Sequence, residues 1–240
     1  MKQRLILIIT LLICSIQITF AQTADEIIKK TLEVQGNDKL KQFKSLKLSG
    51  RLTSMENSAQ FKIIFKYPNS IRSEMSYNNM TLIQAFDGTN GWYIDPNDKD
   101  KKVQKMPDNM LGDLRNQTNL LESPFSDYEK KGIKIKLMGK KKTDGKDCFK
   151  LKLTLKDKSE LYAFIDANKY ILNKTLVDLK KDGKKAKVET YMKNYKSVGG
   201  VMLPHLIETF LDSKKLSSMI MDKVEANSNI DESVFKMPSK

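Results

Sequence analysis

Few residues of this chain have the side chains and spacing that catalysis or metal binding needs. His205 is the only histidine of the 240 residues, and it follows Pro204 in an alternating run. One histidine without further His or Cys ligands does not make the usual zinc site, and the sequence has no Gly-x-Ser-x-Gly elbow to supply a nucleophile. We therefore expect His205 to be structural, and we expect a protein that is not an enzyme and carries no cofactor or metal.

An acidic cluster resembles the start of a calcium-binding loop. The cluster consists of Asp95, Asn97, Asp98 and Asp100, but Lys99 sits where the fifth-position ligand should be and Asp100 replaces the glycine that the sharp turn requires. We therefore predict a hairpin tip rather than a calcium site.

Two other reactive-looking features also have ordinary explanations. Gly88-Thr89-Asn90-Gly91 joins two predicted strands and opens no helix, so it predicts a tight turn and not a phosphate cradle. Cys148 is the only cysteine after residue 21, so a disulfide framework is excluded. No base lies near it in sequence, so we expect a packed or semi-exposed small residue on the lysine side of a strand.

The strongest pattern is an alternation of apolar and polar residues between Phe61 and Pro96. Successive side chains of a strand face opposite sides of a sheet, so these runs predict an antiparallel meander with one apolar and one polar face. The apolar face has large rings and methionines but no group that could do chemistry, which favours holding an apolar ligand over transforming it. Its members are Phe61, Ile63, Phe65, Tyr67, Ile71, Met75, Tyr77, Met80, Leu82 and Phe86.

Helical signals occur at two places. Thr23 and Glu26 form a capping box, and the helix that they begin ends at Gly36. Residues 106–125 depart from the alternation, because Met110, Leu111, Leu114 and Leu121 recur at helical spacing behind a possible cap at Asp108. This segment predicts a short amphipathic helix and loop that cover the apolar face of the sheet as a lid.

Strands account for most of the remaining chain. They are predicted at Ser45–Thr53, Ala59–Tyr67, Ser70–Tyr77, Met80–Asp87, Gly91–Asp95, Lys134–Lys142, Phe149–Lys156, Glu160–Asp166, Leu172–Lys180, Lys187–Tyr195, Met202–Leu211 and Leu216–Val224. About twelve strands in sequential order cannot stay flat, because twist accumulates from strand to strand. We therefore expect a mainly β fold, a wide antiparallel sheet curled into an incomplete barrel or a barrel, with the helices over its concave face.

The beginning of the chain predicts export. Lys2 and Arg4 precede an apolar run from Leu5 to Ile18, and a small residue, Ala21, stands at the expected cleavage site. A membrane anchor needs a longer run, and a lipoprotein signal at Cys14 would need a small residue before it. We expect residues 1–21 to be a signal peptide and residues 22–240 to form a single domain outside the cytoplasm.

The formal charge of +14 raises the question of nucleic acid. Arginine is scarce, and it is the residue that supplies forked contacts to phosphates and bases. Lys134, Lys136, Lys140 and Lys142 alternate with apolar residues, which indicates the solvated back of a sheet. We expect no nucleic-acid partner, and weak attraction to anionic lipid head groups is the alternative.

Methionine is spread over the predicted strands and lid. Because it fills irregular space and adapts to varied apolar partners, it suits both ordinary core packing and a deformable lining for acyl chains. The residues concerned are Met75, Met80, Met106, Met110, Met192, Met202, Met219 and Met221.

Three stretches resemble the LolA-like outer-membrane lipoprotein-sorting family, in the version common in Bacteroidetes-type bacteria. They read YPNSIRSEM, LIQAFDGTNGWYIDP and NIDESVFKMP, and the likeness extends over nearly the whole mature chain. The resemblance implies an incomplete barrel with an apolar cavity for lipoprotein acyl chains, and a monomeric periplasmic carrier. It also implies an inner-membrane release complex and an outer-membrane acceptor as partners.

One departure from the family concerns the lid. Typical members have Arg directly before the Pro-Asn pair and an aromatic residue three positions after that Pro, where this chain has Tyr67 and Ile71. The family Arg is thought to help hold the lid closed. Arg72 is adjacent but is expected on the opposite face, so the role does not transfer to it.

The leading hypothesis is thus a periplasmic carrier or chaperone that holds acyl chains of lipoproteins or lipids. A sensor of lipid or misfolded envelope protein that acts through a regulatory partner is the alternative, and a lipid-acting enzyme is the third. The predicted cavity residues are Leu48, Phe61, Ile63, Phe65, Tyr67, Ile71, Met75, Leu82, Phe86 and Trp92, with Met110, Leu111 and Leu114 in the lid.

Overall fold

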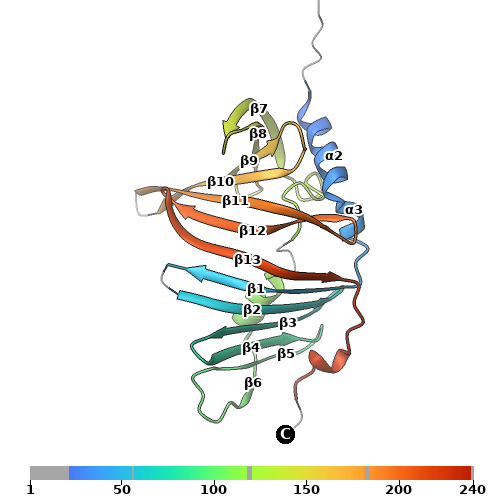
Figure 1. Cartoon of the computed structure of the whole chain (residues 1–240), viewed down its shortest axis with the longest axis vertical. Coiled ribbons are helices and arrows are strands. Elements are labelled where there is room, and N and C mark those ends of the chain that lie inside the picture. The colour runs from blue at the N-terminus through green and yellow to red at the C-terminus, as the bar shows by residue number, and fades with distance from the viewer. Residues whose placement is uncertain (1–21, 56, 118–120, 182–183, 239–240) are drawn as a thin grey trace, which may run out of the picture.

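One antiparallel sheet forms the frame of the molecule (Figure 1). The computed structural model describes residues 22–55, 57–117, 121–181 and 184–238, and the predicted signal peptide lies outside these ranges. Within them, thirteen strands lie in the order β6-β5-β4-β3-β2-β1-β13-β12-β11-β10-β9-β8-β7. Because β6 and β7 are edges that do not pair with each other, the sheet is not closed into a barrel.

The strands agree closely with the alternation in the sequence. They are β1 (Ser45–Ser54), β2 (Asn57–Lys66), β3 (Ser70–Tyr77), β4 (Met80–Phe86), β5 (Gly91–Ile94), β6 (Val103–Lys105), β7 (Lys134–Thr143), β8 (Lys146–Thr154), β9 (Glu160–Asp166), β10 (Leu172–Lys181), β11 (Lys184–Val198), β12 (Val201–Leu211) and β13 (Lys214–Ala226). The prediction missed β6, which is too short to alternate visibly.

The expected sequential strand order is wrong at one place. β1 pairs with β13 in the middle of the sheet, for example Leu52 with Met219, so the first and last strands join two meanders. The chain moves from one edge to the other between β6 and β7, through the helical segment that follows β6.

The first helix, α2 (Ala24–Gln35), begins as predicted. Thr23 accepts from the Glu26 backbone amide, and the Glu26 carboxylate accepts from the Thr23 amide. The helix ends at Gly36, whose φ of 73° is left-handed, and a Cβ there would collide with the Gly200 carbonyl oxygen. A single further turn, α3 (Asn37–Leu40), follows directly.

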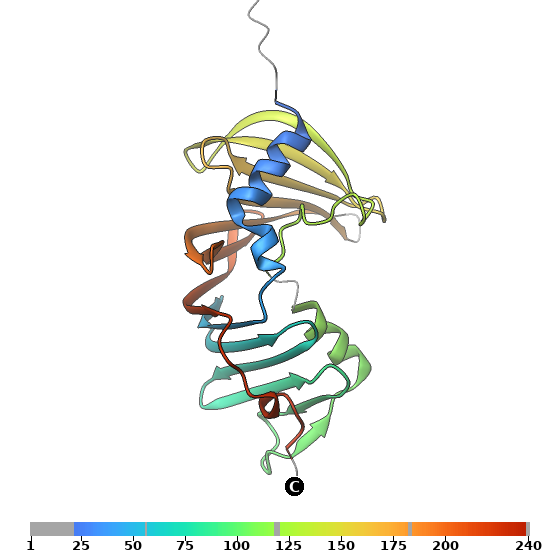
Figure 2. The ribbon, with the colours of Figure 1, turned by 90° about the vertical axis from the view of Figure 1, so that its right-hand side faces the viewer.

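The predicted lid is the helix α4 (Asp108–Asn116), which contacts β4. Figure 2 shows α2 and α3 along the upper part of the molecule and α4 against the lower part. Asp108 was expected as the N-cap and is instead the first helical residue, because Pro107 occupies the cap position.

Two hydrophobic clusters form on the concave face. The first core cluster lies under α4 and consists of Phe43, Leu46, Leu48, Phe61, Ile63, Phe65, Ile71, Phe86, Met106, Leu114, Val201, Leu203 and Met221. The second core cluster lies under α2 and consists of Ile27, Ile28, Phe125, Phe149, Leu151, Leu153, Ala163, Ile165 and Leu172. The helices thus cover the sheet in two separate places.

Candidate functional site: an apolar cavity between two cores

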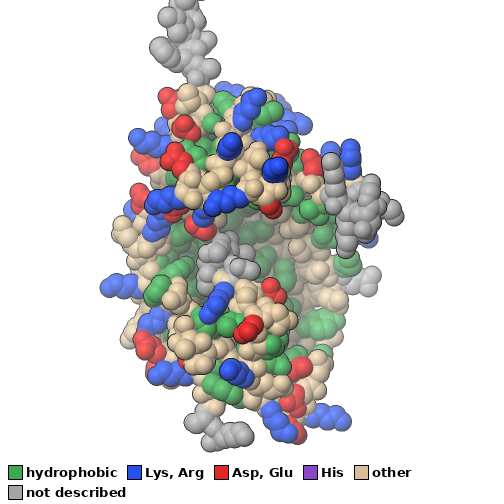
Figure 3. Space-filling view, turned by 180° about the vertical axis from the view of Figure 1, so that it is seen from behind, with side chains coloured by type: hydrophobic (Ala, Val, Ile, Leu, Met, Phe, Trp, Pro, Cys, Tyr) green, Lys and Arg blue, Asp and Glu red, His purple; other side chains and the backbone are tan. Residues whose placement is uncertain are grey.

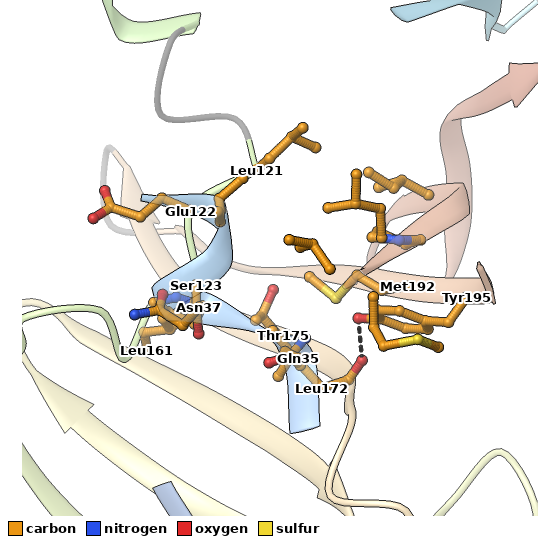
Figure 4. Close-up of a pocket in the computed structure, with 17 residues that line it drawn as sticks. Gln35, Asn37, Leu121, Glu122, Ser123, Leu161, Leu172, Thr175, Met192 and Tyr195 are labelled. Atoms are coloured by element: carbon orange, nitrogen blue, oxygen red, sulfur yellow. Dashed lines mark hydrogen bonds between the residues drawn. The ribbon is translucent and has the colours of Figure 1, made fainter. Parts of the chain in front are cut away.

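A cavity of about 250 Å³ lies where the two core clusters meet (Figure 4). Val201, Leu203 and Ile207 line it from the side of the first cluster, and Leu161 and Leu172 line it from the side of the second. Figure 3 shows the hollow from behind, with hydrophobic side chains gathered between the two ends of the molecule. The space therefore lies on the concave face of the central strands.

Strand alternation points the lining side chains inward. Thr175 pairs with Ala163 on β9 and with Thr190 on β11, and Met192 pairs with Ile207 on β12. Each of these pairs shares a sheet face, so β9 to β12 present one continuous inner surface. Gln35 of α2 and Leu40 of α3 border this surface without filling the space, so the side chains of Thr175 and Met192 line a hollow instead of a packed interior.

The segment after α4 covers the other side of the cavity. Leu121, Glu122, Ser123 and Pro124 line it, and the next residue, Phe125, is fully buried in the second core cluster. We call residues 121–128 the roof segment. It is the part of the enclosure that carries no regular secondary structure.

Polar contacts tie the roof segment to the leading helices. Lys41 donates to Asp127 at 2.9 Å, and the Tyr128 hydroxyl donates to Asp25 at 2.9 Å. The Lys41 ammonium lowers the pKa of Asp127, while burial and the neighbouring Asp25 carboxylate raise the pKa of Tyr128 to about 12. Such contacts contribute little free energy because they are partly exposed, so the burial of Phe125 is the main contact that holds the segment in place.

A second, smaller cavity of about 180 Å³ adjoins the first, and both are lined by Asn37, Leu40, Leu121 and Glu122. Tyr67 reaches it from the end of β2, where burial raises the pKa of its hydroxyl. Ligand sites typically measure about 300–1,000 Å³, so neither space alone reaches that range and the two together do. A ligand larger than a short chain would have to displace the roof segment.

Most of the predicted cavity residues lie together, but they pack against one another in the first core cluster and do not line the cavity. Leu48, Phe61, Ile63, Phe65, Ile71 and Phe86 are buried members of the first core cluster, with Tyr67, Met110 and Leu111 packed against it. Leu114, on α4, is 1% exposed within the same cluster. Of the predicted set, only Tyr67 lines one of the two adjoining cavities.

Met75 and Leu82 continue the same face beyond the cluster. Met75 lies opposite Phe61 and Leu82 in the strand register, so all three share the concave face. Met75 is nevertheless 37% exposed, because the cover provided by α4 does not extend over it.

Trp92 does not lie in the cavity, and the expectation for it is wrong. It pairs with Ala85, whose neighbour Phe86 faces inward, so Trp92 faces the convex side. There its indole N–H donates to the Phe235 carbonyl oxygen at 2.8 Å. The C-terminal segment, with the short helix η2 (Glu232–Val234), crosses this side of the lower sheet (dark red in Figure 2).

Arg72 also faces the convex side, as expected. Its guanidinium lies 5.4 Å from the centre of the Trp92 ring and donates to the Val234 carbonyl oxygen at 3.0 Å. A different arginine, Arg115, belongs to the lid helix α4, and its guanidinium lies 4.5 Å from the centre of the Phe86 ring on the sheet. In this protein, then, a cation joins the lid to the sheet from the lid side.

The residues that resemble parts of catalytic or metal sites make structural contacts. His205 is buried, and its Nδ1 lies 3.2 Å from the Leu203 carbonyl oxygen. Asp95 and Asp98 accept from backbone amides within the β5–β6 connection, which is the predicted hairpin tip. Cys148 is fully buried, and this burial raises the pKa of its thiol.

Two further observations concern only the described ranges. No group of three or more His, Cys, Asp and Glu side chains is placed there to hold a metal ion. None of the helices in those ranges is long and apolar enough to cross a membrane.

The sequence reasoning placed the cavity too far towards the first strands. It missed Leu161, Leu172, Thr175 and Ile207, although these residues alternate in the same way as the ones it chose. The methionine pattern was the better signal, because Met192 and Met202 both line the central cavity.

Comparisons with known proteins agree with this architecture. A family model described as "Uncharacterized protein" matches residues 58–239. A search of curated proteins finds no match. The chain is similar in structure to a DUF1329 family protein from Desulfovibrio piger, with a TM-score of 0.59 and 10% identity over 90% of this chain and 98% of that one.

A LolA superfamily protein from Nitrosomonas europaea is also similar, with a TM-score of 0.53 and 14% identity over 90% of this chain and 98% of that one. Likeness at such low identity bears on the fold and not on the activity. The resemblance read from the three sequence stretches is thereby confirmed at the level of the fold. The chain belongs to the family whose model covers residues 58–239, and its architecture is LolA-like.

Proposed function

We propose that this protein is an exported carrier that holds the hydrocarbon chains of lipids or lipoproteins in the central cavity and hands them on towards the outer membrane. The observation that carries the proposal is the apolar cavity between the two core clusters, closed by a roof segment without regular structure. An inner-membrane releasing complex and an outer-membrane acceptor are the partners that the proposal requires.

The energetics of an apolar chain suit this site. Each buried methylene gains about 0.8 kcal/mol, so a twelve-carbon chain gains about 9 kcal/mol before the costs of association are subtracted. Methionines such as Met192 and Met202 adapt to chains of different shape. Since shape-tolerant contacts supply most of this free energy, release needs the roof segment to open or a partner to compete.

The cavity also defines what the lid regions do in this proposal. α4 stays packed on the first core cluster through Leu114, and the roof segment moves. The predicted residues of the first cluster, such as Phe65 and Ile71, then stay packed under α4 while the chain occupies the central cavity.

The test is displacement of N-phenyl-1-naphthylamine, a neutral apolar dye, from detergent-free protein by a dipalmitoylated lipopeptide. We expect saturable dye fluorescence and displacement by the lipopeptide. Thr175→Phe fills the cavity and should weaken dye binding at least about tenfold, which is about 1.4 kcal/mol. Leu176→Phe, the neighbour whose side chain faces the convex side opposite Glu189, is the matched control.

Overpacking costs about 1–3 kcal/mol of stability, so the unfolding transition of both variants is measured beside binding. The proposal fails if the wild-type protein does not bind the dye. It also fails if Thr175→Phe and Leu176→Phe bind the dye as the wild type does.

A further inference from the structure

Strands β10 and β11 separate at one end of their pairing. Their register runs from Lys174 opposite Tyr191 to Lys181 opposite Lys184, and β11 then continues through residues 195–198 in register with β12. The Tyr195 hydroxyl spans the separation and donates to the Leu172 carbonyl oxygen at 2.7 Å (Figure 4). The sheet therefore contains a split that a side-chain contact closes in place of a backbone ladder.

A third cavity, of about 470 Å³, lies at this split, and we call it the lysine cavity. Its polar and charged lining residues include Asp144, Lys146, Asp166, Lys169, Asn173, Lys193 and Asn194. Met192, Tyr195 and Met202 line both this space and the central apolar cavity. The two cavities thus share one thin wall made of two flexible methionines and a tyrosine.

The carboxylates of the lysine cavity are already engaged. Asp166 accepts from the backbone amides of Asn168 and Lys169 at 3.0 and 2.9 Å. Asp144 lies 3.5 Å from the Lys193 ammonium. Asp144 is thus paired with Lys193, and Asp166 is held in place by backbone amides.

Two of the three lysines lack an anionic partner within the described residues. Lys146, an exposed residue, donates at 3.4 Å to the amide oxygen of the buried Asn173, and Lys169, also exposed, forms no ion pair there. An unpaired ammonium beside a buried polar amide favours an anion, because charge-assisted hydrogen bonds are the stronger kind.

We propose that the lysine cavity binds the anionic head group of an amphiphile whose hydrocarbon chain enters the central cavity past Met192 and Met202. This inference rests on the proposed function, and it narrows the cargo from apolar chains in general to amphiphiles with a phosphate or carboxylate head group. A methionine side chain has three rotatable bonds, so these two residues can turn aside without a change in the strands.

The test compares three probes by isothermal titration calorimetry, each below its critical micelle concentration: dodecyl phosphate, dodecyl maltoside and inorganic phosphate. The first two share a chain and differ in head-group charge, and the third has the charge without the chain. We expect dodecyl phosphate to bind about tenfold more tightly than dodecyl maltoside, and inorganic phosphate to bind far more weakly than either.

Two double variants test which lysines cause the preference for dodecyl phosphate over dodecyl maltoside. The double variant Lys146→Gln, Lys169→Gln should remove the tenfold preference and leave dodecyl maltoside binding unchanged. The double variant Lys99→Gln, Lys101→Gln removes the same charge from the exposed β5–β6 connection, and it should keep the preference. Thr175→Phe should weaken both dodecyl compounds together, since one chain site serves both.

Each contrary outcome has a separate meaning. Equal affinity for the two dodecyl compounds, or inorganic phosphate binding as tightly as dodecyl phosphate, overturns the head-group site and leaves the carrier proposal standing. Equal loss of preference in both double variants also overturns it, because net charge alone would then explain the result. Failure of both dodecyl compounds to bind overturns the proposed function itself.

Discussion

The Tyr195 hydroxyl donates a hydrogen bond of 2.7 Å to the Leu172 carbonyl oxygen, across the place where β10 and β11 part. In a regular antiparallel pair this distance would be spanned by backbone N–H and C=O groups alone. One side-chain hydrogen bond therefore spans the wall between the central cavity and the lysine cavity, and Met192 and Met202 complete that wall. At this place the wall is held by side chains and not by a backbone ladder.

Removing this contact should have a measurable cost. Tyr195→Phe keeps the ring but leaves the carbonyl of Leu172, a residue that is 4% exposed, without this donor. We expect the free energy of unfolding, measured in urea, to fall by about 1–2 kcal/mol. Tyr77→Phe removes an exposed hydroxyl contact to Asn57 and should cost less than about 0.5 kcal/mol. Equal losses of unfolding free energy in the two variants would show that the bond across the split stabilises the fold no more than an exposed hydroxyl contact does.

The same tyrosine predicts a dependence on alkaline pH. Burial raises the pKa of Tyr195 above its ordinary value of 10.0, so the folded protein keeps a proton that the unfolded chain releases. The difference in free energy of unfolding between the wild type and Tyr195→Phe should therefore be constant below about pH 10. Above about pH 10, this difference should decrease by about 1.4 kcal/mol per pH unit, because the unfolded chain loses the proton first. A difference that stays constant through about pH 11 would contradict the burial of this hydroxyl.

The lid helix should be secured chiefly by one leucine. Leu114 is 1% exposed in the first core cluster, so Leu114→Ala should lower the free energy of unfolding by about 2–4 kcal/mol. Amide hydrogen exchange within residues 108–116 should accelerate, because α4 has little other burial of its own. The neighbour Asp113 is exposed, and Asp113→Ala serves as the control. Unchanged exchange in Leu114→Ala would mean that α4 is held by other contacts.

Trp92 is the only tryptophan, which makes its fluorescence specific for the convex side. Phe235→Ala removes a ring that is 1% exposed and should shift the Trp92 emission to the red, with a loss of about 3–5 kcal/mol of stability. Filling the central cavity with dodecyl maltoside should leave the emission of the wild type unchanged. Strong quenching by that ligand would contradict the position of Trp92 outside the cavity.

The sequence predicted the local features of the fold because they depend on local patterns. Phe61, Ile63 and Phe65 share the inner face as their alternation requires, and the Thr23–Glu26 capping box forms as predicted. The pairing of β1 with β13 was missed, since alternation fixes which face a residue such as Leu52 presents and not which strand lies beside it. Trp92 was misplaced for a related reason: the β4–β5 turn sets its register, and one residue of shift reverses its face.

The cavity was harder to predict than the sheet. Thr175 and Met192 belong to the same alternating pattern as the packed residues of the first core cluster. Whether such a residue meets a neighbour or a hollow depends on where α2 and the roof segment come to lie. That placement is tertiary and has no counterpart in the periodicity of a strand.

The most direct test of the central claim is native mass spectrometry of the protein purified from its own cell envelope without detergent. We predict a bound amphiphile of defined mass that dissociates on activation, and its loss from the Thr175→Phe variant but not from Leu176→Phe. Protein that is always empty, and that gains no mass when incubated with dodecyl phosphate or a lipopeptide, would contradict the account.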